Sequence, residues 1–192
     1  MTAEDADRQA PGAAGDTRGR VVLAFDTATD AIAVALIDRW GEDVRLRAAR
    51  DFEARRAALS RLLPAVQELL TAEGVSLTQV SGFVVGRGPG SFTGVRIAVA
   101  TAKGLAHGRG VPLWGVSTLD AVAWRLNDHT GLIGVVGDAM RGEVYPALYR
   151  AMDGRLERLT PDRVSSPRSA AADFAATGEH VLLTGNGLAK YG

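Results

Sequence analysis

The sequence GRGPGSFTGVR at residues 86–96 is the most informative stretch of this chain. It follows the apolar run at 82–86 and precedes small apolar residues, which predicts a buried strand, a glycine-rich turn and a helix over about 91–107. Backbone N–H groups at such a turn can bind an anion at the helix N-terminus. The spacing matches neither the Walker motif nor G-x-G-x-x-G. A tight turn with Ser91 or Thr93 as the N-cap explains the same residues equally well.

Three strands and one helix are expected upstream of this turn. The apolar run at 21–25, the branched residues at 31–37 and the alternating residues at 44–48 predict strands joined by tight turns. Leucine and valine then recur at three- and four-residue spacing, which predicts an amphipathic helix over 53–73 that ends at Gly74. Pro64 inside it predicts a kink or a restart of the helix. A third helix is expected over 119–126.

The same order of elements recurs in the second half of the chain. An apolar run at 132–138 ends in Asp138 just as the first strand ends in Asp26, and a hairpin follows at 144–150 and 155–159. A short helix over 167–177 and a strand ending in Gly-Asn-Gly at 185–187 complete the second copy, with no helix expected after Gly187. The sequence therefore predicts a duplicated α/β fold: a disordered leader (1–20), a first lobe (21–129) and a truncated second lobe (130–192).

Composition excludes several classes of function. The chain has 22 basic and 22 acidic residues, so it lacks the basic excess typical of a protein that binds nucleic acid by itself. It has no cysteine, which removes disulfides and thiolate chemistry. No signal peptide or membrane-spanning stretch is visible, so we expect a cytoplasmic protein with no membrane contact.

Three segments carry candidate chemistry. Asp26 lies at a strand end, where it can hold Mg²⁺ through water in a phosphotransferase, or form an Asx turn. Arg141, Glu143 and Tyr145 can polarise a substrate, but an ion pair on a hairpin beside a half-buried tyrosine is favoured. No pair of histidines has metal-binding spacing, so no metal site is expected. The candidate nucleotide-binding residues are Asp26, Thr27, Gly88, Gly90, Ser91, Thr93 and Gly94.

Together these strings resemble the TsaB (YeaZ) family, a branch of the actin-like/sugar-kinase/Hsp70 (RNase H-like) fold. The resemblance rests on FDTAT at 25–29, on residues 86–97 and on residues 137–145, and it extends over residues 21–192. It implies a non-catalytic subunit that pairs with TsaD, the paralogue that transfers threonylcarbamoyl to the adenosine beside the tRNA anticodon. It also implies an assembly with the ATPase TsaE, tRNA contact through the complex, and no cofactor of its own, with ATP and Mg²⁺ used only in the complex.

The resemblance further implies that the first two helices form the partner face. In TsaD the first of these helices carries two metal-binding histidines, whose positions fall near Ala58 and Leu62 here, and neither residue can bind a metal. The alternatives are an ATP-dependent phosphotransferase or transferase of the same superfamily, a peptidase, and a homodimer through the same helices. The expected partner-face residues are Leu59, Leu62, Leu63, Val66, Arg96, Val99, Ala100 and Lys103.

Overall fold

The computed structural model describes residues 19–54 and 57–192, so most of the expected leader lies outside the described residues. The first half forms a five-stranded sheet, which we call sheet 1, in the order β3-β2-β1-β4-β5. Strands β1, β2 and β3 are antiparallel neighbours, whereas β4 and β5 run parallel to β1. The elements are β1 (Arg20–Asp26), β2 (Ala31–Trp40), β3 (Asp43–Glu53), α1 (Ala58–Ala72), η1 (Leu77–Gln79), β4 (Val80–Gly86), α2 (Phe92–Arg109), β5 (Leu113–Val116) and α3 (Thr118–Trp124).

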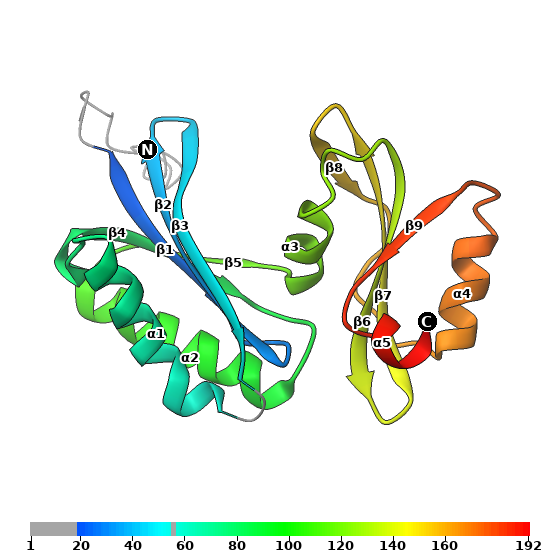
Figure 1. Cartoon of the computed structure of the whole chain (residues 1–192), viewed down its shortest axis with the longest axis horizontal. Helices are drawn as coiled ribbons and strands as arrows, with labels where there is room; N and C mark the ends of the chain where they lie inside the picture. Colours follow the sequence, from blue (N-terminus) through cyan, green and yellow to red (C-terminus); the bar gives the residue numbers. More distant parts are fainter. Residues whose placement is uncertain (1–18, 55–56) are drawn as a thin grey trace, which may run out of the picture.

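Helices α1 and α2 lie side by side on one face of sheet 1 (Figure 1). Alternate residues of the strands, such as Leu23, Val34 and Phe83, point to this face and form the main hydrophobic core with the helices. Leu62 and Leu69 supply the apolar stripe of α1, and alanines supply that of α2. The small side chains of α2 let this helix approach the sheet closely.

The second half forms a four-stranded sheet, sheet 2, in the order β8-β7-β6-β9. Strand order and directions repeat those of the first four strands of sheet 1. This repetition confirms the expected duplicated two-lobe α/β fold. The elements are β6 (Gly131–Met140), β7 (Glu143–Met152), β8 (Arg155–Arg158), α4 (Pro167–Ala175), β9 (Val181–Thr184) and α5 (Leu188–Tyr191).

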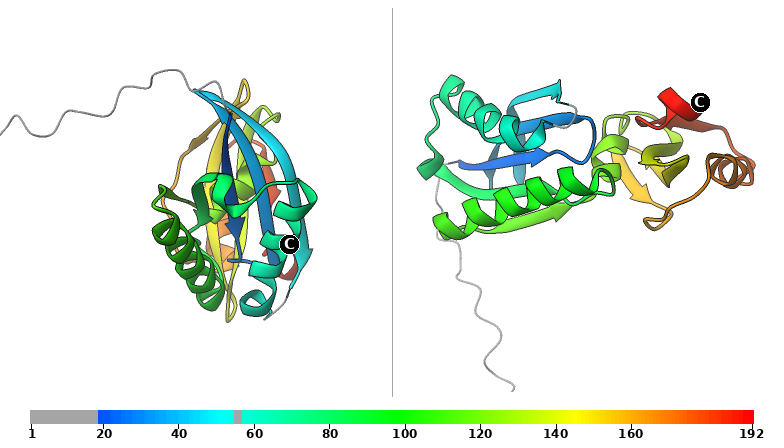
Figure 2. Two further views of the ribbon diagram at one scale, coloured as in Figure 1. Left: turned by 90° about the vertical axis from the view of Figure 1, so that its left-hand side faces the viewer. Right: turned by 90° about the horizontal axis from the view of Figure 1, so that it is seen from below.

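Helix α3 precedes residue 130 in the chain, yet it packs on sheet 2. Leu119 and Ala123 of α3 form a hydrophobic cluster with Ile133, Val135 and Tyr149. Helix α4 covers the opposite face through Phe174. Sheet 2 is therefore covered on both faces, and the right-hand view of Figure 2 shows the lobes joined end to end through the segment around α3.

Several boundaries differ from the sequence predictions. Helix α1 begins at Ala58 and not at residue 53, because β3 continues to Glu53 in register with Ala31. Helix α1 runs continuously through Pro64, so no restart occurs. A short helix, α5, follows Gly187 where none was expected, and the predictions missed β5. Among the described residues no helix is both long and apolar enough to cross a membrane.

Candidate functional site

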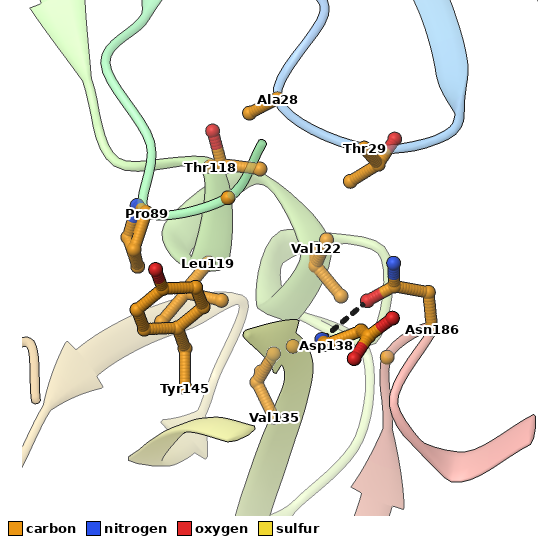
Figure 3. A pocket seen from close by; sticks show the side chains of 13 residues that line it. Ala28, Thr29, Pro89, Thr118, Leu119, Val122, Val135, Asp138, Tyr145 and Asn186 are labelled. Atoms are coloured by element: carbon orange, nitrogen blue, oxygen red, sulfur yellow. Dashed lines mark hydrogen bonds between the residues drawn. The ribbon is translucent and has the colours of Figure 1, made fainter. Parts of the chain in front are cut away.

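A small cavity lies where the lobes meet, at the ends of β1, β4, β6 and β9 (Figure 3). The space open to a water-sized sphere is about 20 Å³, which is enough for on the order of one water molecule. A nucleotide does not fit into this cavity as it stands. The lining residues are Ala28, Thr29, Pro89, Gly90, Thr118, Leu119, Val122, Val135, Gly137, Asp138, Tyr145, Gly185 and Asn186.

The carboxylate of Asp26 lies beside this cavity, and both of its oxygens accept hydrogen bonds from the protein. The Ala28 N–H donates to Oδ1 at 2.6 Å, and the Thr118 hydroxyl donates to Oδ2 at 2.6 Å. Burial raises the pKa of Asp26, while the hydrogen bonds from Thr118 and from the backbone at Ala28 and Thr27 lower it. These contacts match the Asx-turn interpretation and tie the start of α3 to the end of β1.

We predict that Asp26→Asn is neutral or slightly stabilising at pH 7. Burial raises the pKa of Asp26 in the folded protein above its ordinary value of 3.8. Below pH 3.8 the protonated carboxyl group therefore stabilises the folded state, and this stabilisation is lost as the pH rises through the folded-state pKa. An amide removes the buried charge and can still accept from Ala28 and donate to the Thr118 oxygen. The expected gain is between zero and about 1 kcal/mol at pH 7, shrinking toward pH 4. Urea unfolding at pH 7 and pH 4 measures the change in the free energy of unfolding. A marked loss of stability at pH 7 would contradict the prediction.

The glycine-rich turn packs tightly against the turn between β1 and β2. The Thr27 hydroxyl donates to the Gly94 carbonyl oxygen at 2.6 Å, and the Ser91 N–H donates to the Ala28 carbonyl oxygen at 2.6 Å. A Cβ at Gly94 would overlap the backbone of Thr27, and a Cβ at Gly90 would overlap that of Ala28. Glycine is therefore required at these positions because the two turns approach each other closely. The β1–β2 turn fills the space beside the glycine-rich turn and accepts a hydrogen bond from one of the N–H groups that a phosphate would need.

The remaining predicted residues of this turn have ordinary structural roles. Ser91 caps α2, as expected, by accepting a hydrogen bond from the Gly94 N–H at 3.2 Å. Gly88 has a positive φ of 83°, and its carbonyl oxygen accepts from the Thr118 N–H. The side chain of Thr93 is exposed. The structure thus brings six of the seven candidates together, with Thr93 pointing to solvent.

The second copy of the motif repeats the turn with different partners. The Met140 N–H donates to Asp138 Oδ1 at 3.0 Å, and Lys190 of α5 forms an ion pair with Oδ2. The Asp138 N–H donates to Asn186 Oδ1 at 3.0 Å (Figure 3). The hydrogen bond with Asp138 raises the pKa of Lys190. Both lobes therefore use the aspartate to close a turn.

The hairpin between β6 and β7 only partly matches the prediction. Tyr145 is half-buried beside the cavity, as expected. The expected ion pair is wrong: within residues 19–54 and 57–192, Arg141 and Glu143 form no ion pair with each other, and both are exposed. Met140 and Arg141 both have positive φ in this tight turn.

A network of polar side chains at the base of α3 was not predicted from the sequence. The buried Tyr149 hydroxyl donates to Asp120 at 2.8 Å, and Arg158 donates to the same oxygen at 3.0 Å and to Asp162 at 2.6 Å. Burial and the hydrogen bond to Asp120 raise the pKa of Tyr149 well above its usual range. The sequence predicted a helix over 119–126, which α3 (Thr118–Trp124) largely matches, but no spacing pattern could reveal its contacts with β7 and β8.

Two kinds of catalytic arrangement were sought among the described residues, a metal-binding cluster and a serine–histidine pair. No group of three or more His, Cys, Asp or Glu side chains within residues 19–54 and 57–192 is arranged to hold a metal. The Ser91 hydroxyl accepts from the Gly94 N–H, and no contact joins it to a histidine in this part of the chain. The junction therefore lacks the nucleophile-and-base geometry of a peptidase among the described residues.

The expected partner face divides into exposed and buried side chains. Leu59 is 79% exposed and Leu63 51%, whereas Leu62 is 1% and Val66 4% exposed. Including Leu62 and Val66 was wrong, because both point into the core against sheet 1. On α2, Arg96, Ala100 and Lys103 are exposed and Val99 is half-buried. The exposed Phe92, which was not predicted, carries the Arg96 guanidinium 3.9 Å from its ring centre.

Comparison with known proteins identifies the family. A family model described as "TsaD: tRNA N6-adenosine threonylcarbamoyltransferase" matches residues 52–181. The TsaB proteins of Escherichia coli and Bacillus subtilis are 46% and 37% identical to this chain, over 67% and 74% of it. The crystal structure of YeaZ from Pseudomonas aeruginosa superposes with a TM-score of 0.68 at 34% identity, over 77% of this chain and 68% of that one. The chain belongs to the TsaB/YeaZ family.

The chain matches only part of the length of its TsaB relatives. The match covers 54% of the E. coli TsaB protein and 60% of the B. subtilis one, so the chain spans about half the length of the curated relatives it matches. The E. coli and B. subtilis proteins are named for tRNA threonylcarbamoyladenosine biosynthesis. A second P. aeruginosa structure is described as similar to "peptidase YEAZ". The geometry at Ser91 gives this peptidase description no support here.

Proposed function

We propose that this chain is a non-catalytic subunit in tRNA threonylcarbamoyladenosine biosynthesis that binds the catalytic paralogue TsaD through the outer face of α1 and α2. The observation that carries the proposal is the exposed apolar surface of these neighbouring helices, formed by Leu59, Leu63 and Phe92. Large apolar side chains clustered on a surface favour a protein partner. The lobe junction, by contrast, is packed by the chain's own turns.

Helix α2 has a second feature that favours a helical partner. Gly104 and Gly108 lie in the helix, and a Cβ at either position would meet nothing within 4 Å. Each glycine costs the isolated helix up to about 1 kcal/mol relative to alanine. Small residues on an outer helix face let another helix approach closely. The absence of acidic residues from α2, which carries Arg96 and Lys103, favours a partner surface with carboxylates.

The same proposal assigns the remaining roles to the complex. The zero formal net charge favours tRNA contact through TsaD and not through this chain. We propose that ATP and Mg²⁺ act only in the assembly with TsaD and the ATPase TsaE, and that the chain works in the cytoplasm without a cofactor of its own. A homodimer through α1 and α2 is the alternative use of this face when TsaD is absent.

The double substitution Leu59→Glu with Leu63→Glu tests the proposal. Both side chains are exposed, so the fold should tolerate it, whereas two charges in a desolvated interface should weaken TsaD binding at least about 100-fold. Isothermal titration with the TsaD protein of the same organism measures the affinity. Met152→Glu, an exposed apolar residue on β7, is the matched control and should bind normally.

Two results would count against the proposal. Unchanged affinity of the double variant would remove α1 from the interface. Strong binding of Mg-ATP by the isolated chain, with no TsaD complex, would instead favour the phosphotransferase alternative.

A further inference from the structure

The first turn of α2 carries an exposed aromatic ring and an arginine in contact with each other. Phe92 is 69% exposed, and Arg96, four residues later, is exposed beside it. Residues four apart are neighbours on a helix surface. The central carbon of the Arg96 guanidinium lies over the Phe92 ring, 3.9 Å from its centre, which is a van der Waals contact. We call these two residues the Phe–Arg pair.

A second arginine in the same lobe also lies over a ring, but that ring has a different role. The Arg61 guanidinium of α1 is 5.3 Å from the centre of the Phe52 ring, and Phe52 is half-buried against the main core. Phe92, by contrast, belongs to none of the hydrophobic clusters of the described residues. The ring of Phe92 therefore packs on Arg96 without contributing to the core.

The backbone that carries the Phe–Arg pair is held in place on both sides of Phe92. The Ser91 N–H donates to the Ala28 carbonyl oxygen at 2.6 Å, and the Ser91 hydroxyl accepts from the Gly94 N–H at 3.2 Å. Gly94 packs directly against the backbone of Thr27. Because this turn is already ordered in the free protein, a partner that binds there pays little to order it. The tight packing of the glycine-rich turn thus prepares the start of α2 for binding.

The charge of Arg96 is available to an acidic group from outside the chain. Within residues 19–54 and 57–192, no ion pair joins Arg96 to a carboxylate. Helix α2 carries basic side chains, among them the exposed Lys103 seven residues further on, and no Asp or Glu. A planar guanidinium can stack on a ring and at the same time donate two parallel N–H bonds to a carboxylate.

We propose that the Phe–Arg pair binds one carboxylate side chain of TsaD and determines specificity at this point of the interface. Arg96 donates to the carboxylate, and Phe92 is the positioning residue that holds the guanidinium. This inference rests on the proposed binding of TsaD and goes further by naming the chemistry of the partner residue. The ring already shields one face of the cation from water, which lowers the cost of burying it. A partner without an acid there would leave the cation buried and unpaired, and would be rejected.

Isothermal titration with the TsaD protein of the same organism measures the contribution of Arg96. Arg96→Gln should weaken binding at least about 30-fold, because the charge and the planar fork are both lost. Arg96→Lys, which keeps only the charge, should weaken it about 10-fold. Added salt should weaken the wild type more than Arg96→Gln. Arg61→Gln is the matched control, since Arg61 is also exposed over a ring, and it should bind within about twofold of the wild type.

A double-mutant cycle tests whether Phe92 acts through Arg96. Phe92→Leu keeps an apolar side chain but removes the ring, and should weaken binding about 5- to 10-fold. Phe92→Tyr keeps the ring and should bind like the wild type. In the Arg96→Gln background, Phe92→Leu should cost no more than about twofold, because the group that it positions is gone. Both side chains are exposed, so circular dichroism should show every variant folded.

A charge exchange identifies the carboxylate. Arg96→Glu should abolish binding, and arginine in place of one exposed Asp or Glu of TsaD, tested one position at a time, should restore it. If Arg96→Gln binds TsaD as tightly as the wild type, if Phe92→Leu costs the same in both backgrounds, or if no position restores binding, the Phe–Arg proposal is overturned while TsaD binding stands. A wild-type chain that does not bind TsaD overturns the proposed function itself.

Discussion

Replacing Gly94 with alanine is expected to destabilise the protein by about 3 kcal/mol or more. The added Cβ would overlap the carbonyl group of Thr27, and the obstacle is backbone held in place by β1 and β2. Relief requires α2 to move away from the β1–β2 turn. That movement also breaks the hydrogen bond from the Thr27 hydroxyl to the Gly94 carbonyl oxygen. Urea unfolding of the two proteins measures the difference in the free energy of unfolding.

Gly104→Ala in the same helix is the matched control. It introduces the same methyl group where nothing lies within 4 Å, so it should stabilise the protein by up to about 1 kcal/mol. If Gly94 served only to bind phosphate, both substitutions would leave the fold intact and Gly94→Ala would change nucleotide binding alone. Equal effects of the two substitutions on stability would contradict the packing interpretation.

Much of the fold was predictable because each copy of the repeated unit has the same local sequence patterns. Apolar runs ending in Asp26 and Asp138, followed by hairpins and amphipathic helices, indicate two copies of one unit without any knowledge of tertiary contacts. The glycine-rich turn was also placed correctly between β4 and α2. Such features depend on residues close together in the sequence, where propensity and periodicity act directly.

The parts that were missed depend on contacts between distant residues. Strand β5 has only four residues and carries apolar side chains on both faces, so its sequence shows no alternation of polar and apolar residues. The packing of α3 on sheet 2 is set by Tyr149 and Arg158, which lie far along the chain. The two interpretations of the glycine-rich turn could be separated only once Thr27 and Ala28 were seen to fill the space beside it.

The leucine stripe of α1 shows the same limit within one helix. Leu59, Leu62, Leu63 and Val66 all lie on the apolar arc of the helix, with Leu59 and Leu63 toward the edge away from the buried Ala65 and Leu69. The sheet covers one part of this arc, and the rest is left to solvent or to a partner. The sequence alone gives no signal for where the division falls, so two core residues were assigned to the partner face.

Leu62→Glu is therefore expected to unfold much of the protein, at a cost of about 4 kcal/mol or more. The side chain is 1% exposed against sheet 1, and it packs among the apolar side chains of the main core. A domain of this kind has about 5 to 15 kcal/mol of stability in total. Thermal unfolding followed by circular dichroism should show a large drop in Tm and a broadened transition.

Leu59→Glu, three residues earlier on the same helix, should change stability by no more than about 0.5 kcal/mol. The pair separates folding from binding: Leu59→Glu should lose TsaD while remaining folded, whereas any loss of binding in Leu62→Glu follows from unfolding. A stable Leu62→Glu protein would mean that α1 is rotated about its axis relative to the structure. In that case Leu62 and Val66 would return to the partner face, and the outer surface of α1 would need to be redrawn.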